Sequence, residues 1–214
     1  MRSKFDEQLA LLNRDLTKMG SLCEEALALA AKALANADGQ TAAKIAPIDS
    51  EIDQMERTIE SLCLKLLLQQ QPVARDLRQI SAALKMITDM ERIGDQASDI
   101  AEIIGFLNGR IGTDAQYICQ MAVAAMRMVT ESVEAYVKRD VAMAEATIQH
   151  DDVVDDLFLK VKESLIQMIS VNPKDGEYAL DLLMIAKYFE RIGDHATNIA
   201  EWVVFSVTGV HEQV

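Results

Sequence analysis

Apolar residues recur every three or four positions along most of the chain, a spacing typical of amphipathic helices. The pattern predicts six long helices, separated by short segments rich in Gly, Asn or Pro. Pro47 predicts a late start or a kink in the second helix, and Pro72 suits the first turn of the third. The expected helices cover residues 3–36, 41–70, 72–107, 113–138, 141–170 and 177–207.

One stretch of the chain occurs twice. Residues 91–102 read ERIGDQASDIAE and residues 190–201 read ERIGDHATNIAE, so nine of twelve positions are identical at an offset of 99. Aspartates earlier in each half also match, at an offset of 102; the pairs are Asp38 and Asp140, Asp49 and Asp151, and Asp53 and Asp155. Such self-similarity indicates an internal repeat of one structural unit.

Each half of the chain contains three of the expected helices, joined by short connections that favour antiparallel neighbours. Glycine and asparagine at residues 108–112 form the main break between the halves. We therefore predict an all-α fold of two tandem three-helix bundles packed side by side. Residues 1–108 form the first repeat, and residues 113–214 form the second.

The composition and charge of the chain argue against some classes of function. Aromatic residues make up only 5% of the 214 residues, and the formal net charge is −13. An acidic surface repels phosphate backbones, so we expect no nucleic-acid partner. No apolar run reaches the roughly 18–20 residues that span a bilayer, and charged residues precede the first apolar run. Cys23, Cys63 and Cys119 fit no zinc-binding pattern. We expect a cytoplasmic protein with three reduced cysteines.

Acidic residues share one face of the repeated stretch. On a helix with about 100° per residue, Glu91, Asp95, Asp99 and Glu102 fall within about 80° of one another. The ordinary interpretation is a solvated helix face. However, like charges four residues apart disfavour a helix, and both copies keep them. Both copies also place a glycine, Gly94 or Gly193, between the carboxylates, which indicates close approach by another group.

The second and fifth expected helices carry matching acidic pairs. Asp49 and Asp53 are four residues apart, as are Asp151 and Asp155. If these pairs face the repeated stretches, four or more carboxylates converge and repel one another unless a cation lies between them. Carboxylate oxygens suit hard divalent ions such as Mg²⁺, Mn²⁺ and Ca²⁺, and also iron. We therefore predict one metal site in each half.

Motifs for catalysis are missing from the sequence. There is no Gly-rich phosphate loop, no HExxH and no Glu-x-x-His ligand pair. We expect that the chain is not an enzyme. A metal-dependent hydrolase or a metal-storage bundle remains the alternative, because a carboxylate-rich metal site can in principle support hydrolysis.

The doubled ERIGD, the run Gln71-Pro-Val-Ala-Arg-Asp-Leu-Arg78 and the acidic pairs at Asp49 and Asp151 resemble the PhoU family of bacterial phosphate-signalling accessory proteins. The resemblance covers essentially the whole chain. It implies two tandem three-helix bundles that hold iron, zinc, nickel, manganese or magnesium at acidic motifs. Carried over residue by residue, the ligands are Asp49, Asp53, Glu91, Asp95 and Asp99 in one half, and Asp151, Asp155, Glu190, Asp194 and Asn198 in the other.

The same resemblance implies a function. Members of the family negatively regulate the phosphate-starvation response by coupling a phosphate ABC transporter to a membrane histidine kinase, and they restrain uptake when phosphate is plentiful. The implied partners are the ATPase subunit of the transporter and the cytoplasmic region of the kinase. We expect contact with the membrane only through these partners, and we consider a homodimer as a candidate assembly.

Overall fold

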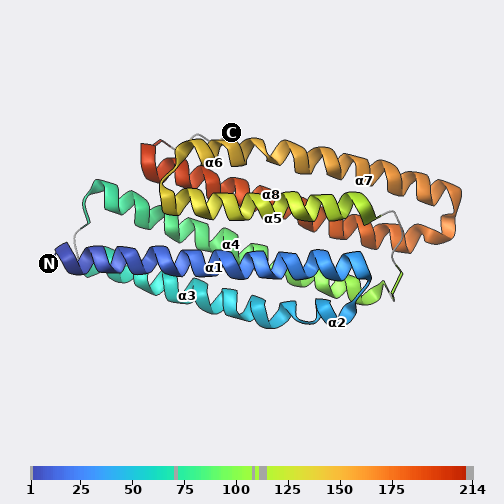
Figure 1. Cartoon of the computed structure of the whole chain (residues 1–214), viewed down its shortest axis with the longest axis horizontal. Coiled ribbons are helices and arrows are strands. Elements are labelled where there is room, and N and C mark those ends of the chain that lie inside the picture. The colour runs from blue at the N-terminus through green and yellow to red at the C-terminus, as the bar shows by residue number, and fades with distance from the viewer. Residues whose placement is uncertain (1, 70–71, 108, 111–114, 211–214) are drawn as a thin grey trace.

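The computed structural model describes residues 2–69, 72–107, 109–110 and 115–210. Most of these residues are helical, and none of them lies in a β-strand. The six long helices predicted from the sequence are present (Figure 1). The elements are α1 (Arg2–Asn36), α2 (Gly39–Ala42), α3 (Ile45–Gln69), α4 (Ala74–Phe106), α5 (Gln116–Lys138), α6 (Val141–Gln149), α7 (Asp151–Val171), the 3₁₀ turn η2 (Pro173–Asp175) and α8 (Gly176–Thr208).

Two of the predicted helices are interrupted. The second is divided into α2 and α3, and Pro47 lies in the first turn of α3, so the expected late start is confirmed. The prediction of an unbroken fifth helix over residues 141–170 is wrong, because this segment is divided at His150 into α6 and α7. The sequence around His150 contains neither Pro nor Gly, so it carries no breaker signal.

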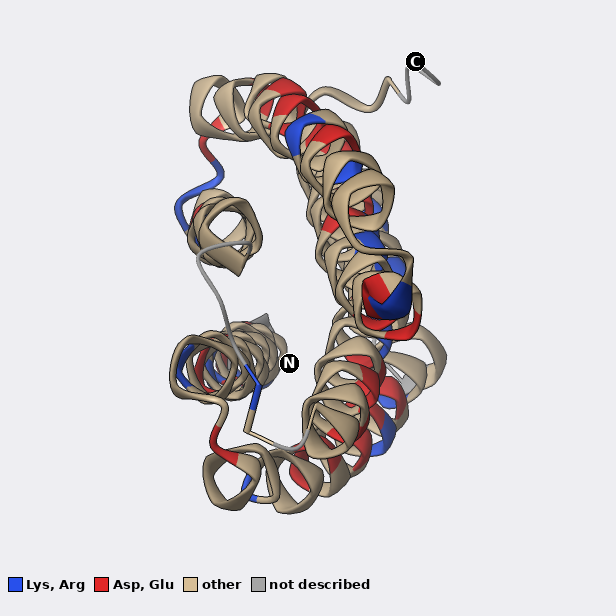
Figure 2. Ribbon diagram, turned by 90° about the vertical axis from the view of Figure 1, so that its right-hand side faces the viewer, with Lys and Arg blue, Asp and Glu red and all other residues tan. Residues whose placement is uncertain are grey.

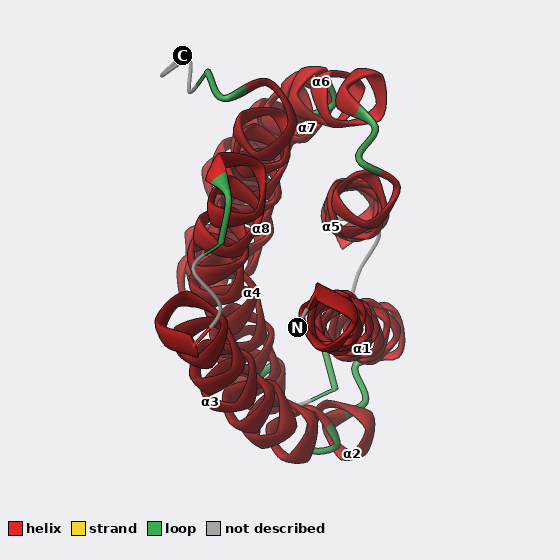
Figure 3. Cartoon of the chain, turned by 90° about the vertical axis from the view of Figure 1, so that its left-hand side faces the viewer, coloured by secondary structure: helices red, strands yellow, loops and turns green. Residues whose placement is uncertain are grey.

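The helices form two layers. Figure 3 shows α3, α4, α8 and α7 side by side in a curved row, with α1 and α5 on its concave side. Helix α4 packs against α8, and α1 packs against α5, so the two halves meet along the length of the molecule. Each half contributes three long helices, and the predicted side-by-side arrangement of two bundles is confirmed.

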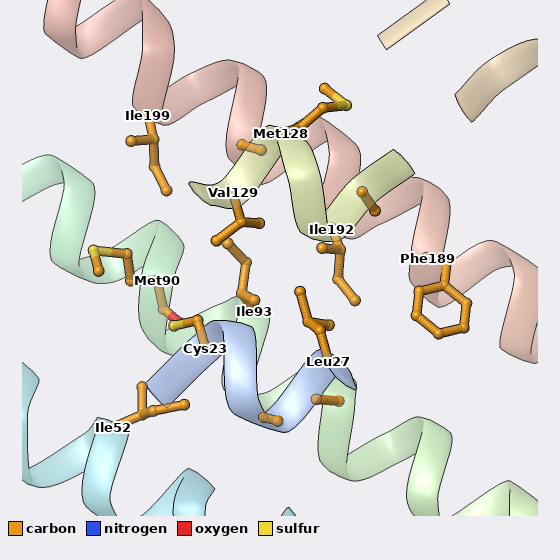
Figure 4. Close-up of a cluster of buried hydrophobic side chains, with 14 of the residues drawn as sticks. Cys23, Leu27, Ile52, Met90, Ile93, Met128, Val129, Phe189, Ile192 and Ile199 are labelled. Atoms are coloured by element: carbon orange, nitrogen blue, oxygen red, sulfur yellow. The ribbon is translucent and has the colours of Figure 1, made fainter. Parts of the chain in front are cut away.

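A continuous apolar core lies between the two layers. Cys23, Leu27 and Ile93 of the first half pack with Val129 and Ile192 of the second half in one cluster (Figure 4). Ile93 and Ile100 in the first repeated stretch and Ile192 and Ile199 in the second are buried, as expected of the apolar face of an amphipathic helix. All three cysteines are free, and Cys23 and Cys63 are buried. The core therefore joins the two repeats.

Acidic residues gather on the outer face of the curved row. Figure 2 shows Asp and Glu along the side of α3, α4, α7 and α8 that faces away from α1 and α5. The helices therefore carry one apolar and one polar face, as the sequence pattern predicts. Among the described residues, no helix has the combination of length and apolar character that would let it cross a membrane.

Candidate metal centre

Three aspartates from two helices converge in the first half. Asp49 and Asp53 lie one turn apart on α3, and Asp95 lies on the facing side of α4. One carboxylate oxygen from each residue lies within 4.8 Å of the other two. Asp49 and Asp53 are half-buried, and Asp95 is exposed. This convergence, which we call the first acidic cluster, brings together three of the residues predicted as ligands; Glu91 and Asp99 are not part of the group at this spacing.

The glycine in the repeated stretch allows this approach. A Cβ atom at Gly94 would lie 2.7 Å from Asp49 Oδ1 and 3.0 Å from Ile52 Cδ1. Asp49 Oδ2 accepts a hydrogen bond from Ser98 Oγ at 2.8 Å. Asp49 Oδ1 is buried and has no hydrogen-bond partner among the described residues. A buried carboxylate oxygen without a partner is costly unless a cation or another donor reaches it.

Burial and mutual repulsion change the acidity of these groups. Burial raises the pKa of Asp49, and the charges of Asp95, Asp53 and Asp99 raise it further. The pKa of Asp95 is raised by burial and then by Asp53 and Asp99. The pKa of Glu91 is raised by burial and then by Asp95. Each of these carboxylates is therefore less stable in its charged form than it would be in water.

A second acidic cluster occupies the corresponding place in the second half. It comprises Asp151 and Asp155 on α7 with Glu190 and Asp194 on α8. Burial raises the pKa of Asp151 to about 6, and the charges of Asp194, Asp155 and Glu190 contribute in that order. The pKa of Asp155 and that of Asp194 are also raised, first by burial and then by Glu190. The predicted residues therefore lie close enough to repel one another.

The two clusters are not equivalent. Lys187 Nζ donates to both carboxylate oxygens of Glu190, whereas the matching residue in the first half is Thr88. No other group of three acidic, His or Cys side chains within the described residues meets the spacing found at Asp49, Asp53 and Asp95. The first cluster therefore lacks the lysine that partly neutralises the second.

Asp99 and Asn198, predicted as matching ligands, lie where the two halves meet. Asp99 is close enough to the first cluster to raise the pKa of Asp49, and it also contacts Tyr188 of α8. Asn198 Nδ2 instead donates to Asp89 Oδ1 of α4 at 3.2 Å. Asp99 therefore lies beside the first acidic cluster, whereas Asn198 is hydrogen-bonded to a residue of the first repeat.

Sequence reasoning missed the partner of Asn198. Asp89 Oδ1 also lies 2.8 Å from His195 Nδ1, and both of these side chains are largely shielded from water. The helical pattern by itself favours a surface or edge position for His195. Asp89 lies outside both the twelve-residue repeat and the run Gln71–Arg78, so no sequence motif singled it out.

The donor set fits a hard divalent cation at the first cluster. It consists of carboxylate oxygens, which Mg²⁺, Mn²⁺ and Ca²⁺ prefer. A cation there would supply a partner for the orphaned Asp49 Oδ1 and offset the repulsion among Asp49, Asp53 and Asp95. The second cluster has the same chemistry, with Lys187 as a competitor for Glu190.

Comparison with known proteins identifies the family. The family model described as "PhoU domain" matches residues 16–104 and again residues 118–203. The chain belongs to the PhoU family. A phosphate-specific transport system accessory protein PhoU homolog from Clostridium acetobutylicum is 36% identical over 97% of this chain and 96% of its own. One from Synechocystis is 35% identical over 99% of this chain and 94% of its own.

Solved structures agree with the PhoU assignment. The crystal structure of PhoU from Pseudomonas aeruginosa is similar with a TM-score of 0.92 and 33% identity, covering 96% of this chain and 100% of that one. The regulatory protein PhoU from Streptococcus pneumoniae gives a TM-score of 0.89 at 26% identity, over 98% of this chain and 100% of its own. The resemblance inferred from the repeated motifs is thus confirmed, whereas the domain boundary at residues 108–113 stays a prediction.

Proposed function

We propose that this chain is a metal-binding accessory protein of a phosphate-specific transport system and a negative regulator of the phosphate-starvation response. The observation that carries the proposal is full-length similarity to proteins named as accessory to that system, at 36% and 35% identity. The acidic clusters supply the chemistry by which such an adaptor binds metal. The proposed role is regulatory and not catalytic. The sequence contains none of the catalytic motifs considered above.

The metal would be held by residues from two helices in each half. In the first half these are Asp49 and Asp53 of α3 with Glu91, Asp95 and Asp99 of α4. In the second half they are Asp151 and Asp155 of α7 with Glu190, Asp194 and Asn198 of α8. A bound ion would supply positive charge that offsets the repulsion between the carboxylates of the two helices. The identity of the ion is open among Fe, Zn, Mn, Mg and Ni.

The proposed partners are the ATPase subunit of the phosphate ABC transporter and the cytoplasmic region of a membrane histidine kinase. The outer face of α3, α4, α7 and α8 is rich in Asp and Glu (Figure 2). Such a face favours association with basic protein surfaces and disfavours nucleic acid. We propose that the protein acts in the cytoplasm, reaches the membrane only through these partners, and can form a homodimer.

A gene deletion tests the regulatory role. Loss of a negative regulator is expected to raise alkaline phosphatase activity in cells grown with plentiful phosphate. Re-expression of the intact chain is expected to restore low activity. Unchanged alkaline phosphatase after deletion would exclude the proposed role.

Metal analysis of the purified protein tests the sites. We expect bound divalent metal that is removed by a chelator and decreases in the variant Asp49→Asn/Asp95→Asn. Glu163→Gln is a suitable control, because Glu163 is exposed on α7 away from the clusters. Equal metal content in all three proteins would refute the first site, and very large metal loading would instead favour a storage role.

A further inference from the structure

Three arginines lie together where α4 begins and α5 ends, at the end of the molecule that faces the viewer in Figure 3. Arg75 and Arg78 lie in the first turns of α4, and Arg139 follows the last residue of α5. Arg139 Nη1 donates to Gln79 Oε1 at 3.1 Å. Arg75 lies three residues before Arg78 and four before Gln79, so it neighbours both on the surface of α4. We call these three arginines the arginine cluster.

Within the part of the chain that the structure describes, no ion pair neutralises the arginine cluster. Arg78 Nε is buried and has no hydrogen-bond partner in the same part of the chain. Asp76 is nearby without pairing, and Asp140 is used in capping α6, where its Oδ1 accepts from the Met143 amide at 3.0 Å.

Repulsion within the cluster is visible in the acidity of Arg139. Its pKa is lowered first by burial and then by the charge of Arg75, with a further contribution from Arg78. Like charges held close together destabilise a fold unless a bound group compensates. The three arginines therefore lie close enough to interact, in a chain whose net charge is −13.

The internal repeat provides a comparison for Arg139. Ala37 occupies the matching position 102 residues earlier, and both residues have a left-handed backbone, with φ of 50° at Ala37 and 57° at Arg139. Each is followed by the aspartate that caps the next helix. The same turn therefore forms with alanine, so its backbone conformation does not require an arginine at position 139.

The opposite end of the molecule has balanced charges. At the offset of 99, Lys174 and Glu177 replace Arg75 and Arg78. Arg110, at that end, pairs with Asp175 at 2.7 Å and lies over the Tyr178 ring, 4.0 Å from its centroid. Of these two ends, the one with Arg75 and Arg78 has no ion pair to its arginines among the described residues, whereas Arg110 at the other end is paired, so repeat architecture alone does not explain the difference.

We propose that the arginine cluster is a binding site for a phosphoryl group. Guanidinium groups present forked donors that match the oxygens of phosphate, and several neighbouring arginines suit a tetrahedral, multiply charged anion better than a single carboxylate. Arg75 lies in the first turn of α4, where the helix dipole also favours an anion. The group belongs to free inorganic phosphate or to the terminal phosphates of a nucleotide.

Titration calorimetry on the full chain tests the site. Inorganic phosphate and ATP are titrated separately into protein treated with a chelator, so that neither ligand can bind through a metal. We expect Arg75→Gln and Arg139→Ala each to weaken binding by about tenfold or more. Arg139→Ala installs the residue that the first repeat already uses at this turn, and thermal melting verifies that both variants fold.

Arg127→Gln is the matched control, because Arg127 is exposed on α5 and already paired with Glu131. Its affinity should equal that of the unaltered chain. Binding of phosphate identifies the free ion as a ligand, and binding of ATP alone identifies a nucleotide. The proposal is overturned if neither binds at millimolar concentration, or if binding survives in both variants. It does not rest on the regulatory role, which the deletion experiment tests separately.

Discussion

Single residues decide how closely the helices of each acidic cluster approach. Glycine is a poor helix former, yet Gly94 and Gly193 lie inside α4 and α8 at matching positions. The space beside each is filled by the aspartate oxygen of the neighbouring helix, Asp49 Oδ1 or Asp151 Oδ1. Because glycine has no side chain, α3 can lie close to α4, and α7 close to α8. We infer that glycine occurs at these positions, despite its low helix propensity, because it allows the carboxylates to approach.

Substitution of Gly94 tests the importance of this close approach. In Gly94→Ala the new Cβ would lie 2.7 Å from Asp49 Oδ1, and either helix must shift. We expect a loss of about 1–3 kcal/mol in the free energy of unfolding, as is typical of overpacking, together with weaker metal binding. Urea denaturation and metal titration measure the two effects.

Gly105 in the same helix is the control. A Cβ there meets nothing within 4 Å, so Gly105→Ala should stabilise the protein by about 0.5–1 kcal/mol through helix propensity alone. If both alanine variants were equally stable, the close packing at Gly94 would have no energetic consequence, and the glycine would not be needed to position the carboxylates.

At the scale of elements, the acidic faces of α3, α4, α7 and α8 oppose folding when no metal is bound. The raised pKa values mean that the folded chain takes up protons more readily than the unfolded chain between about pH 6, the pKa of Asp151, and pH 3.8, its ordinary value. The free energy of unfolding therefore rises as the pH falls through this window. The cluster aspartates stabilise the protein when they are neutral.

Thermal melting of chelator-treated protein between pH 7.5 and pH 5 checks this expectation. The melting temperature should increase as the pH falls. Asp151→Asn should raise stability at pH 7.5 by about 1 kcal/mol, a figure discounted for solvent screening at a half-buried carboxylate, and it should flatten the pH dependence. A melting temperature that fell steadily over this range would show that burial and repulsion of the cluster carboxylates do not govern the stability of the metal-free protein.

The sequence predicted much of how the helices pair. The offset between repeats and the spacing of Asp49, Asp53 and Asp95 predicted which helices meet, because helical periodicity fixes which residues share a face. The break at His150 was missed, since no residue there disfavours a helix strongly. The contact of Asp89 with His195 was also missed, because it depends on how α4 crosses α8, and no local pattern encodes that register.

At the scale of the whole molecule, the two repeats share one core. Side chains from α1, α3 and α4 meet those from α5 and α8 in a single cluster (Figure 4). Asp89 and Asp99 of α4 contact α8 through His195, Asn198 and Tyr188. The interface is therefore part of the fold and not a contact between independent domains.

This shared core predicts cooperative unfolding. Ile93 of α4 and Ile192 of α8 are both fully buried within it. Ile93→Ala and Ile192→Ala should each lower the free energy of unfolding by about 2–5 kcal/mol, and calorimetry should still record one transition for each variant. Leu159→Ala should change little, because Leu159 is 54% exposed. Two resolved transitions in either isoleucine variant would show that the repeats unfold separately, since destabilising one half would then leave the other intact.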